Sequence, residues 1–445
     1  MNDRRLFALF VTAVAVAIVA GAAAIGWAVV RGDRSLLRAA RVEQEQISPN
    51  ADGEQDETLI SYELARNATV SIYFEDAAGE RYYFRRERPR GAGPYEVYFG
   101  GVVDGYRLPG EQLQGEIVSR LLQDGAYTWV VEATDAEGVT ERASGSLLVA
   151  DADPLLPEIR DFSLDRTVFS PNQDGIADRV AVNYFLAKDV AQTRVYLVQP
   201  DGAEVPLPEQ PLEARPNQRG MHTYSYEGGV DLRAQPPPDG IYPLVVETQD
   251  DEGQEVRVER TLTFEYGGLP FASIISPVEG DTLAFNTTTV EICDTLYFTV
   301  TVENYGTTPI RTAGPWSGAV YDSDWNYNTV GWATESGVWR LGIGFENALS
   351  DYPYRWGLGT PETLTEIDGE YYLMPGERGV VRGGIRVLDA FGVRNPQPVW
   401  AGLIHEDIEI SVHNNRVDTH DILVAVPTAE ERPRCAPREK TRYAP

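Results

Sequence analysis

Apolar and polar residues alternate along much of this chain, which is the pattern of β-strands with one buried face. The alternation is clear over residues 60–64 and again over 180–186, where aliphatic and aromatic side chains stand at every second position. The Asp-Gly pairs at 124–125 and 239–240 are turn signals between strand segments. Short strands, tight turns and the lack of a helical period predict an all-β fold of tandem immunoglobulin-like β-sandwiches.

One stretch breaks this alternation, because residues 6–30 carry no charged side chain and are mostly apolar. A helix needs about 20 apolar residues to cross a bilayer. The sequence therefore predicts one N-terminal transmembrane helix over 6–30, after a cytoplasmic stub of residues 1–5 and before a juxtamembrane spacer over 31–45. The alternative is a signal sequence that is cleaved near the small residues Ala22, Ala23, Ala24 and Ala28.

The orientation of this helix rests on two conflicting signals. Positive charge favours the cytoplasmic side, yet arginines follow the apolar run at positions 31, 34, 38 and 41. Everything downstream is typical of a surface protein, so we expect the bulk of the chain to be extracytoplasmic. The predicted localisation is the cell membrane, with a single pass.

A Ser-Pro-Asn-x-Asp-Gly-x-x-Asp motif occurs twice, at 48–56 and at 170–178. A repeat of this kind indicates a duplicated structural unit, so we predict two related modules, over residues 46–150 and 160–268. Further signals follow each copy in the same order, Asp-Gly-x-Tyr at 124–127 and 239–242 and Asp-x-Glu-Gly at 135–138 and 250–253.

These motifs resemble the immunoglobulin-like module of flagellar hook-capping proteins, and similar modules occur in many secreted and surface proteins of bacteria. The resemblance covers about half of the chain. It implies a β-sandwich fold for both modules and a role as spacers and interaction domains, and it says little about a specific activity.

Both copies of the motif place oxygen-bearing side chains around a glycine, Gly53 or Gly175. Calcium binds six to eight oxygen atoms, so the two loops are candidate calcium sites. The bidentate carboxylate that ends an EF-hand loop is missing, because Leu59 and Ala181 stand at that position. The alternative is that the loops are Asx turns without metal. The candidate ligands are Asn50, Asp52, Asp56, Asn172, Asp174 and Asp178.

The chain changes character over residues 269–430, where most of its tryptophans lie. A predicted long strand at 296–304 ends in the turn Tyr-Gly-Thr-Thr-Pro at 305–309. This sequence resembles the Trp-rich immunoglobulin-like domain found in bacterial surface proteins and, as the central domain, in an autophagy-receptor family. Ile310 stands where a tryptophan is expected, so the usual aromatic packing there is in doubt.

Aromatic residues in the polar stretch between about 311 and 360 are candidates for a binding loop. Tryptophan and tyrosine can stack on sugar rings or anchor a protein partner. The alternative is that these rings fill a wide sandwich core. The candidates are Tyr321, Trp325, Tyr327, Trp332 and Trp339.

The chain is strongly acidic, with a formal net charge of −30. Such a charge repels phosphate backbones, so nucleic acid is not expected as a partner. The two cysteines, Cys293 and Cys435, are a candidate disulfide between the third domain and a C-terminal tail over 431–445; free thiols are the alternative.

Metal-type ligands concentrate near the C-terminus around His405, His413 and His420, but their spacing matches no zinc motif. No nucleophile elbow, phosphate loop or dinucleotide motif occurs. We therefore expect a non-catalytic protein with no cofactor other than candidate calcium, tethered by residues 6–30. The two modules would act as spacers, and the Trp-rich domain would bind an envelope protein or polysaccharide. The alternatives are a carbohydrate-active enzyme with accessory β-sandwich domains and an architectural subunit of an envelope or motility assembly.

Overall fold

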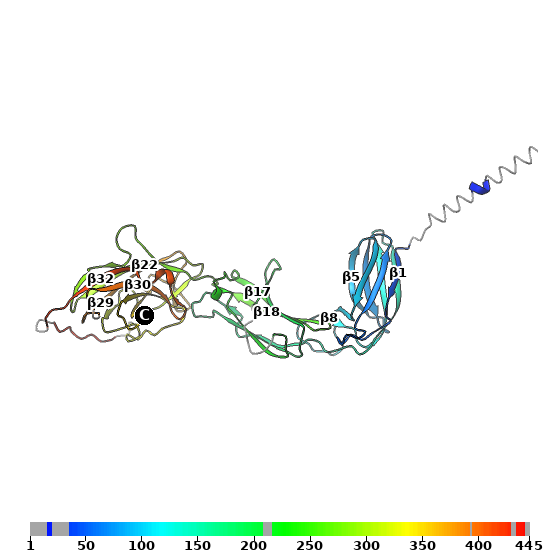
Figure 1. Ribbon diagram of the computed structural model, residues 1–445, viewed down its shortest axis with the longest axis horizontal. Helices are drawn as coiled ribbons and strands as arrows, with labels where there is room; N and C mark the ends of the chain where they lie inside the picture. The colour runs from blue at the N-terminus through cyan, green and yellow to red at the C-terminus, as the bar shows by residue number, and fades with distance from the viewer. Residues whose placement is uncertain (1–15, 20–34, 208–215, 392–393, 429–432, 441–445) are drawn as a thin grey trace, which may run out of the picture.

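The computed structural model describes residues 16–19, 35–207, 216–391, 394–428 and 433–440. Three β-rich units follow one another in a row, with the first module at one end and the Trp-rich domain at the other (Figure 1). The predicted transmembrane segment, residues 6–30, lies outside the described residues apart from 16–19. Among the described residues, no helix combines the length and the apolar character that a membrane span needs.

The first module is a sandwich of two sheets that bury the alternating apolar positions of the sequence. In β3, for example, Ile60, Tyr62 and Leu64 are buried while the residues between them are not. One sheet has the order β1 (Leu37–Val42), β3 (Thr58–Leu64), β6 (Gly93–Phe99). The other has the order β2 (Gln46–Ile47), β10 (Thr140–Val149), β9 (Gly125–Asp135), β4 (Ala68–Glu75), β5 (Arg81–Arg90).

The second module repeats this topology strand for strand. A shift in strand register also recurs. In each module the first strand pairs with the next long strand, and this pairing shifts next to Ala39 (φ 47°) in the first module and next to Asp161 (φ 52°) in the second. The small sheet has the order β11 (Ile159–Leu164), β13 (Val180–Leu186), β16 (Gly220–Tyr226). The large sheet holds β15 (Glu204–Pro206), β14 (Gln192–Val198), β17 (Gly240–Gln249) and β18 (Glu255–Phe264), with β12 (Val168–Phe169) paired to β18; a short 3₁₀ helix spans Val230–Leu232.

Two features differ from the expected boundaries. Residues 37–42 form β1, so the predicted spacer over 31–45 is wrong there; two arginines in this strand masked its pattern, although Leu36 and Leu37 are buried in the core of the first module. In addition, the hairpin of β7 (Val102–Asp104) and β8 (Glu116–Leu121) leaves the first module and extends the large sheet of the second, where β8 pairs with β18.

The third domain packs two larger sheets against each other. One contains β19 (Ala272–Ile275), β22 (Thr295–Asn304), β29 (Arg378–Arg386) and β24 (Val320–Asp322), with β20 (Ala284–Phe285) on β22. The other runs β21 (Thr289–Glu291), β32 (Val417–Ala425), β30 (Gln397–His405), β25 (Trp339–Phe345), β23 (Ile310–Thr312), β28 (Glu370–Leu373), β27 (Thr365–Ile367). β26 (Tyr354–Gly357) pairs with β25, β31 (Glu409–Ile410) pairs with β30, and a 3₁₀ helix spans Val412–Asn414.

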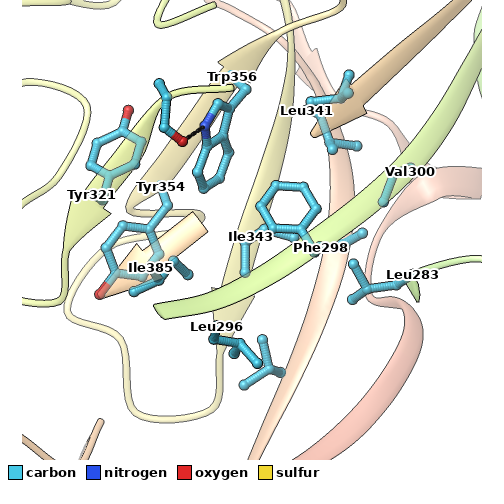
Figure 2. Close-up of a cluster of buried hydrophobic side chains, with 14 of the residues drawn as sticks. Leu283, Leu296, Phe298, Val300, Tyr321, Leu341, Ile343, Tyr354, Trp356 and Ile385 are labelled. Carbon is cyan, nitrogen blue, oxygen red and sulfur yellow. Dashed lines mark hydrogen bonds between the residues drawn. The ribbon is translucent and has the colours of Figure 1, made fainter. Parts of the chain in front are cut away.

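The core between these sheets is rich in aromatic rings (Figure 2). Trp356 is fully buried, its Nε1 donates a hydrogen bond of 3.0 Å to the Ala319 carbonyl oxygen, and its ring meets Phe298 edge to face. Ile310 is also buried in this core. A buried tryptophan needs a partner for its N–H, and the backbone of a neighbouring segment supplies it here.

Cys293 and Cys435 are joined by a disulfide, with Cα atoms 5.2 Å apart. The bond holds residues 433–440 against the third domain, where Arg386 donates to the Ala436 carbonyl oxygen at 3.0 Å. The guanidinium of Arg438 lies 5.8 Å from the ring centroid of Trp325. The described part of the tail therefore covers one of the aromatic residues singled out in the sequence.

Candidate functional site

The first acidic loop, residues 48–56, is held by hydrogen bonds between its own side chains and backbone. The Asp56 carboxylate accepts the N–H groups of Gly53 at 2.7 Å and of Ala51 at 3.1 Å. The side-chain oxygen of Asn50 accepts the N–H of Asp52 at 3.0 Å. These are Asx-type turns, the alternative to a calcium site that the sequence left open.

The second loop, residues 170–178, repeats this network. Asp178 accepts the N–H of Gly175 at 2.7 Å, and the side chain of Asn172 accepts the N–H of Asp174 at 3.0 Å. The candidate ligands of each loop are thus brought together. Their shared role in the structure is to fold the loop ahead of β3 or β13.

The surroundings of the two loops differ, because the third domain covers only the second one. His405 Nε2 donates a hydrogen bond of 2.7 Å to the Gln173 carbonyl oxygen, and the Tyr372 hydroxyl donates one of 3.2 Å to Asp174. The backbones also touch: a Cβ added at Gly175 would lie 2.1 Å from the carbonyl oxygen of Ser336. The second motif is therefore the joint between the second module and the third domain.

Burial at this joint changes the ionisation of its side chains. Removal from water raises the pKa of Asp178 to about 6, and the neighbouring carboxylate of Asp174 adds to that rise. Burial also raises the pKa of Asp174 above its usual range. For His405, burial lowers the pKa to about 4, so the imidazole is neutral at pH 7.

The first loop instead faces an open cleft of about 720 Å³ between the two modules. Asp56 and Glu57 line it from the first module, and Asp251 and Glu252 line it from the turn between β17 and β18. A cleft lined by carboxylates would attract cations. Of the two predicted calcium loops, the first is the one with space beside it.

The candidate aromatic binding loop is mostly interior, as expected from the alternative that its rings fill the sandwich core. Tyr321, Trp325 and Trp339 are 1%, 6% and 3% exposed and belong to the core of the third domain. Tyr327 and Trp332 are half-buried. Residue type alone does not separate a ring that packs inward from one that faces water.

The segment 323–338, which carries three of these rings, covers a buried network of ion pairs. Glu406, which is inaccessible to solvent, accepts hydrogen bonds from Arg340 at 2.8 Å and from Arg355 at 2.9 Å. Its other oxygen accepts the backbone N–H of Glu335 at 2.8 Å, and Arg355 lies 4.0 Å from the ring centroid of Tyr327. Sequence reasoning did not find this network, because its members lie far apart along the chain.

A group of half-buried rings remains on the surface of the third domain. Trp316 meets Trp332 with ring centroids 6.3 Å apart and Tyr371 with centroids 5.3 Å apart, both edge to face. Trp332 was a predicted binding residue; Trp316 and Tyr371 were not. We call these three residues the aromatic group.

The three histidines near the C-terminus do not form one cluster. His405 lies in the joint, and His413 is on the 3₁₀ helix at Val412–Asn414. Only His420 has carboxylates beside it within the described residues: its ligand atom and those of Asp281 and Asp418 lie within 4.8 Å of one another. His420 Nε2 is 3.3 Å from the Asp418 carboxylate.

No known protein family matches this chain, and no curated protein matches it in sequence. Among solved structures it is similar to a Ca²⁺-stabilised adhesin with which an Antarctic bacterium binds ice, at 14% identity over 79% of this chain and 73% of that one, with a TM-score of 0.21. It is also similar to a mixed-linkage glucan-binding protein of Bacteroides ovatus, at 12% identity over 78% and 70%, with a TM-score of 0.15. Similarity at this level carries no argument about function.

Proposed function

We propose that this protein is a membrane-tethered, extracytoplasmic rod that serves a non-catalytic binding or structural role at the cell envelope. Residues 6–30 are the tether, the two modules are spacers, and the Trp-rich domain is the distal head. The observation that carries this proposal is that neighbouring domains contact each other extensively at both boundaries. Loosely linked domains would not hold a head at a distance, whereas in this protein the contacts at each boundary resist bending.

The first joint is a shared sheet. β8 of the first module pairs with β18 of the second, with Ile117 opposite Val256. The Gln254 side chain, fully buried, accepts the N–H of Leu121 and donates to the carbonyl oxygen of Leu155 in the connecting segment. Main-chain pairing across a boundary resists bending, because backbone hydrogen bonds must break for the two modules to move apart.

The second joint is the covered loop 170–178. It combines polar contacts with close backbone packing against residues 336–337. The tail is bound to the same domain by the disulfide of Cys435. Covalent and packed contacts of this kind suit a protein outside the cytoplasm.

The aromatic group is the proposed contact surface of the head. Its three rings are partly open to solvent. Partly exposed tryptophan and tyrosine rings are enriched at binding surfaces. A sugar ring or an apolar side chain of a protein partner could pack against the exposed part of these rings.

Two experiments test the proposal. Protease treatment of intact cells that make the full chain with a C-terminal epitope tag should remove the tag, and a protected tag would overturn the orientation. Binding of the purified full chain to arrays of envelope glycans and proteins should be lost in Trp316→Ala and kept in Tyr297→Ala, a control ring that is 51% exposed on β22. Equal binding by both variants would remove the aromatic group as the contact surface.

A further inference from the structure

Strand β5 carries a concentration of positive charge that is unusual for this chain. Five of its residues are arginines, and all of them are exposed. The chain as a whole has a formal net charge of −30. In so acidic a protein, a basic strand on the surface is a feature that solubility does not require. The arginines are Arg81, Arg85, Arg86, Arg88 and Arg90.

The backbone of β5 gathers three of these arginines on one side. Glu87 has a φ of +49°, and the pairing of β5 with β4 shifts register on both sides of Ile72. A β-bulge of this kind re-aims the side chains that follow it. With regular alternation Arg85 and Arg88 would point to opposite faces, but here both line the same small pocket of about 40 Å³, together with Arg90.

These three arginines lack the carboxylate partners that their neighbours have. Arg81 pairs with Glu75 at 2.8 Å and Arg86 with Asp104 at 3.7 Å. In the part of the chain that the structure describes, no ion pair within 4.0 Å involves Arg85, Arg88 or Arg90. Glu96 also lines the pocket but pairs with none of them.

Aromatic rings hold the guanidinium groups in place. That of Arg85 lies 4.1 Å from the ring centroid of Phe84, and that of Arg90 lies 5.4 Å from the ring centroid of Tyr95. Arg85 is exposed as a residue, but its guanidinium is partly removed from water. This desolvation, followed by the nearby charges of Arg88 and Arg90, lowers the pKa of Arg85. Like charges held together in this way are stabilised by an anion, and a guanidinium binds phosphate through paired hydrogen bonds.

The position of the group within the first module indicates where that anion comes from. Arg90 pairs with Ala68 at the start of β4, and Gly93 pairs with Leu64, whose other neighbour is Leu37. The arginines thus lie toward the end of the module at which β1 begins, next to Leu36 and Leu37. The residues between 30 and 37 span at most about 25 Å of extended chain.

We infer that Arg85, Arg88 and Arg90 form a headgroup-binding surface that holds the first module against the phosphates of anionic phospholipids. This inference rests on the proposed tether, because residues 6–30 bring the module to the bilayer. The surface then adds an electrostatic contact that sets how the rod leaves the membrane. Arginines close to an anionic bilayer interact with it over about one Debye length, roughly 10 Å at moderate salt.

The inference also explains a conflict in the sequence. The arginines at 31, 34, 38 and 41 follow the apolar run and contradict the rule that positive charge stays in the cytoplasm. If the first module rests on anionic headgroups, positive charge on that side of the membrane is expected. These arginines then no longer argue against the outward orientation.

The test uses the full chain in vesicles and the reaction of exposed arginines with phenylglyoxal, read by mass spectrometry for each residue. Vesicles of phosphatidylcholine alone are compared with vesicles of phosphatidylcholine and phosphatidylglycerol in equal amounts. We expect Arg85, Arg88 and Arg90 to react about fivefold more slowly in the anionic vesicles, and high salt to reverse this protection. Arg260, exposed on β18 of the second module, is the internal control and should react equally in both.

Flotation of the protein together with the vesicles tests the tether, and the reaction rates of the arginines test the headgroup surface. If the protein floats with both vesicle types but its arginines react at equal rates in both, the headgroup surface is overturned and the tether is left intact. Flotation with neither type overturns both. Salt-sensitive flotation with anionic vesicles alone supports the surface and overturns the tether. A further arm adds inorganic phosphate to the neutral vesicles; full protection in that arm would show a site for free phosphate and overturn the assignment to lipid.

Discussion

The imidazole of His405 donates a hydrogen bond of 2.7 Å to the main-chain carbonyl oxygen of Gln173, which connects two domains through residues far apart in the sequence. The histidine is 2% exposed. Its ring stacks on Trp339 with centroids 4.3 Å apart. A neutral histidine is therefore built into the joint between the second module and the head.

This histidine should make the joint sensitive to acid. Burial lowers the pKa of His405 from 6.5 to about 4, so between these values the unfolded chain binds a proton that the folded protein does not. The stabilising contribution of the neutral histidine is complete above about pH 6.5 and is lost as the pH falls toward 4. The free energy of unfolding falls by at most about 3 kcal/mol over this range. The free energy of unfolding, measured by urea denaturation from pH 7 to 4, should fall more steeply in the wild type than in His405→Gln.

Asp178 has the opposite effect on the pH dependence of stability. The wild-type curve alone therefore does not isolate the histidine, and the comparison with His405→Gln is needed. Its pKa of about 6 lies above the ordinary value of 3.8, so the folded protein binds the extra proton, and stability is lost as the pH rises from about 4 to 6. Parallel curves for the wild type and His405→Gln would show that the histidine does not titrate as we expect.

Gly175 and Gly53 occupy the same place in the two acidic loops and differ only in their surroundings. Both have positive φ, +84° and +87°, so alanine costs about 1 kcal/mol of backbone strain at either position. A Cβ at Gly175 would also lie 2.1 Å from the Ser336 carbonyl oxygen, whereas nothing lies within 4 Å of one at Gly53. Gly175→Ala should therefore separate the head from the second module, seen as a larger spread of dimensions in small-angle X-ray scattering, and Gly53→Ala should not.

The first joint offers a second matched pair of glycines in the segment before β8. A Cβ at Gly115 would lie 2.3 Å from the Arg257 carbonyl oxygen on β18, and one at Gly110 has nothing within 4 Å. Both have positive φ, +86° and +81°. We expect Gly115→Ala to detach β8 and to open residues 150–158 to limited proteolysis, with Gly110→Ala as resistant as the wild type. Equal cleavage of the two variants would mean that β8 does not stabilise this boundary.

Glu406 should be among the most sensitive positions of the head. It is the carboxylate partner of two buried arginines, and removing one member of such a network leaves charge without compensation inside the protein. Glu406→Gln should lower the free energy of unfolding by about 3–5 kcal/mol. The control Glu346→Gln removes an exposed partner of Arg394 and should cost less than about 1 kcal/mol. Chemical denaturation of both variants measures the difference.

The sequence leaves two interpretations of the acidic loops open, calcium sites and Asx turns without metal, and calcium binding distinguishes them. The hydrogen bonds of Asp56 and Asp178 to their own backbones indicate Asx turns, so we expect calcium to leave the melting temperature unchanged after treatment with a chelator. A rise in melting temperature would show a calcium site. Its loss in Asp56→Asn, with retention in Asp178→Asn, would assign that site to the first loop and its open cleft.

Local pattern predicted the parts of this fold that depend on neighbours in sequence. Alternation at Ile60 to Leu64 placed β3, and the repeated motif predicted two modules, which the structure builds with one topology. The pattern failed at β1, where Arg38 and Arg41 interrupt the apolar residues of the strand. It left Trp325 and Trp339 undecided, because an aromatic ring fits a core as well as a binding loop, and the structure buries both.

The sequence by itself determined the strands, the turns and the duplicated loops, since these follow from side-chain alternation and from hydrogen bonds within a few residues. Only the tertiary structure decided what each loop does. The same motif faces an open cleft at 48–56 and is a joint at 170–178, because the third domain covers the second copy and no described residue packs on Gly53 in the first. Contacts such as that of His405 with Gln173 depend on how whole domains pack, and no local pattern carries that information.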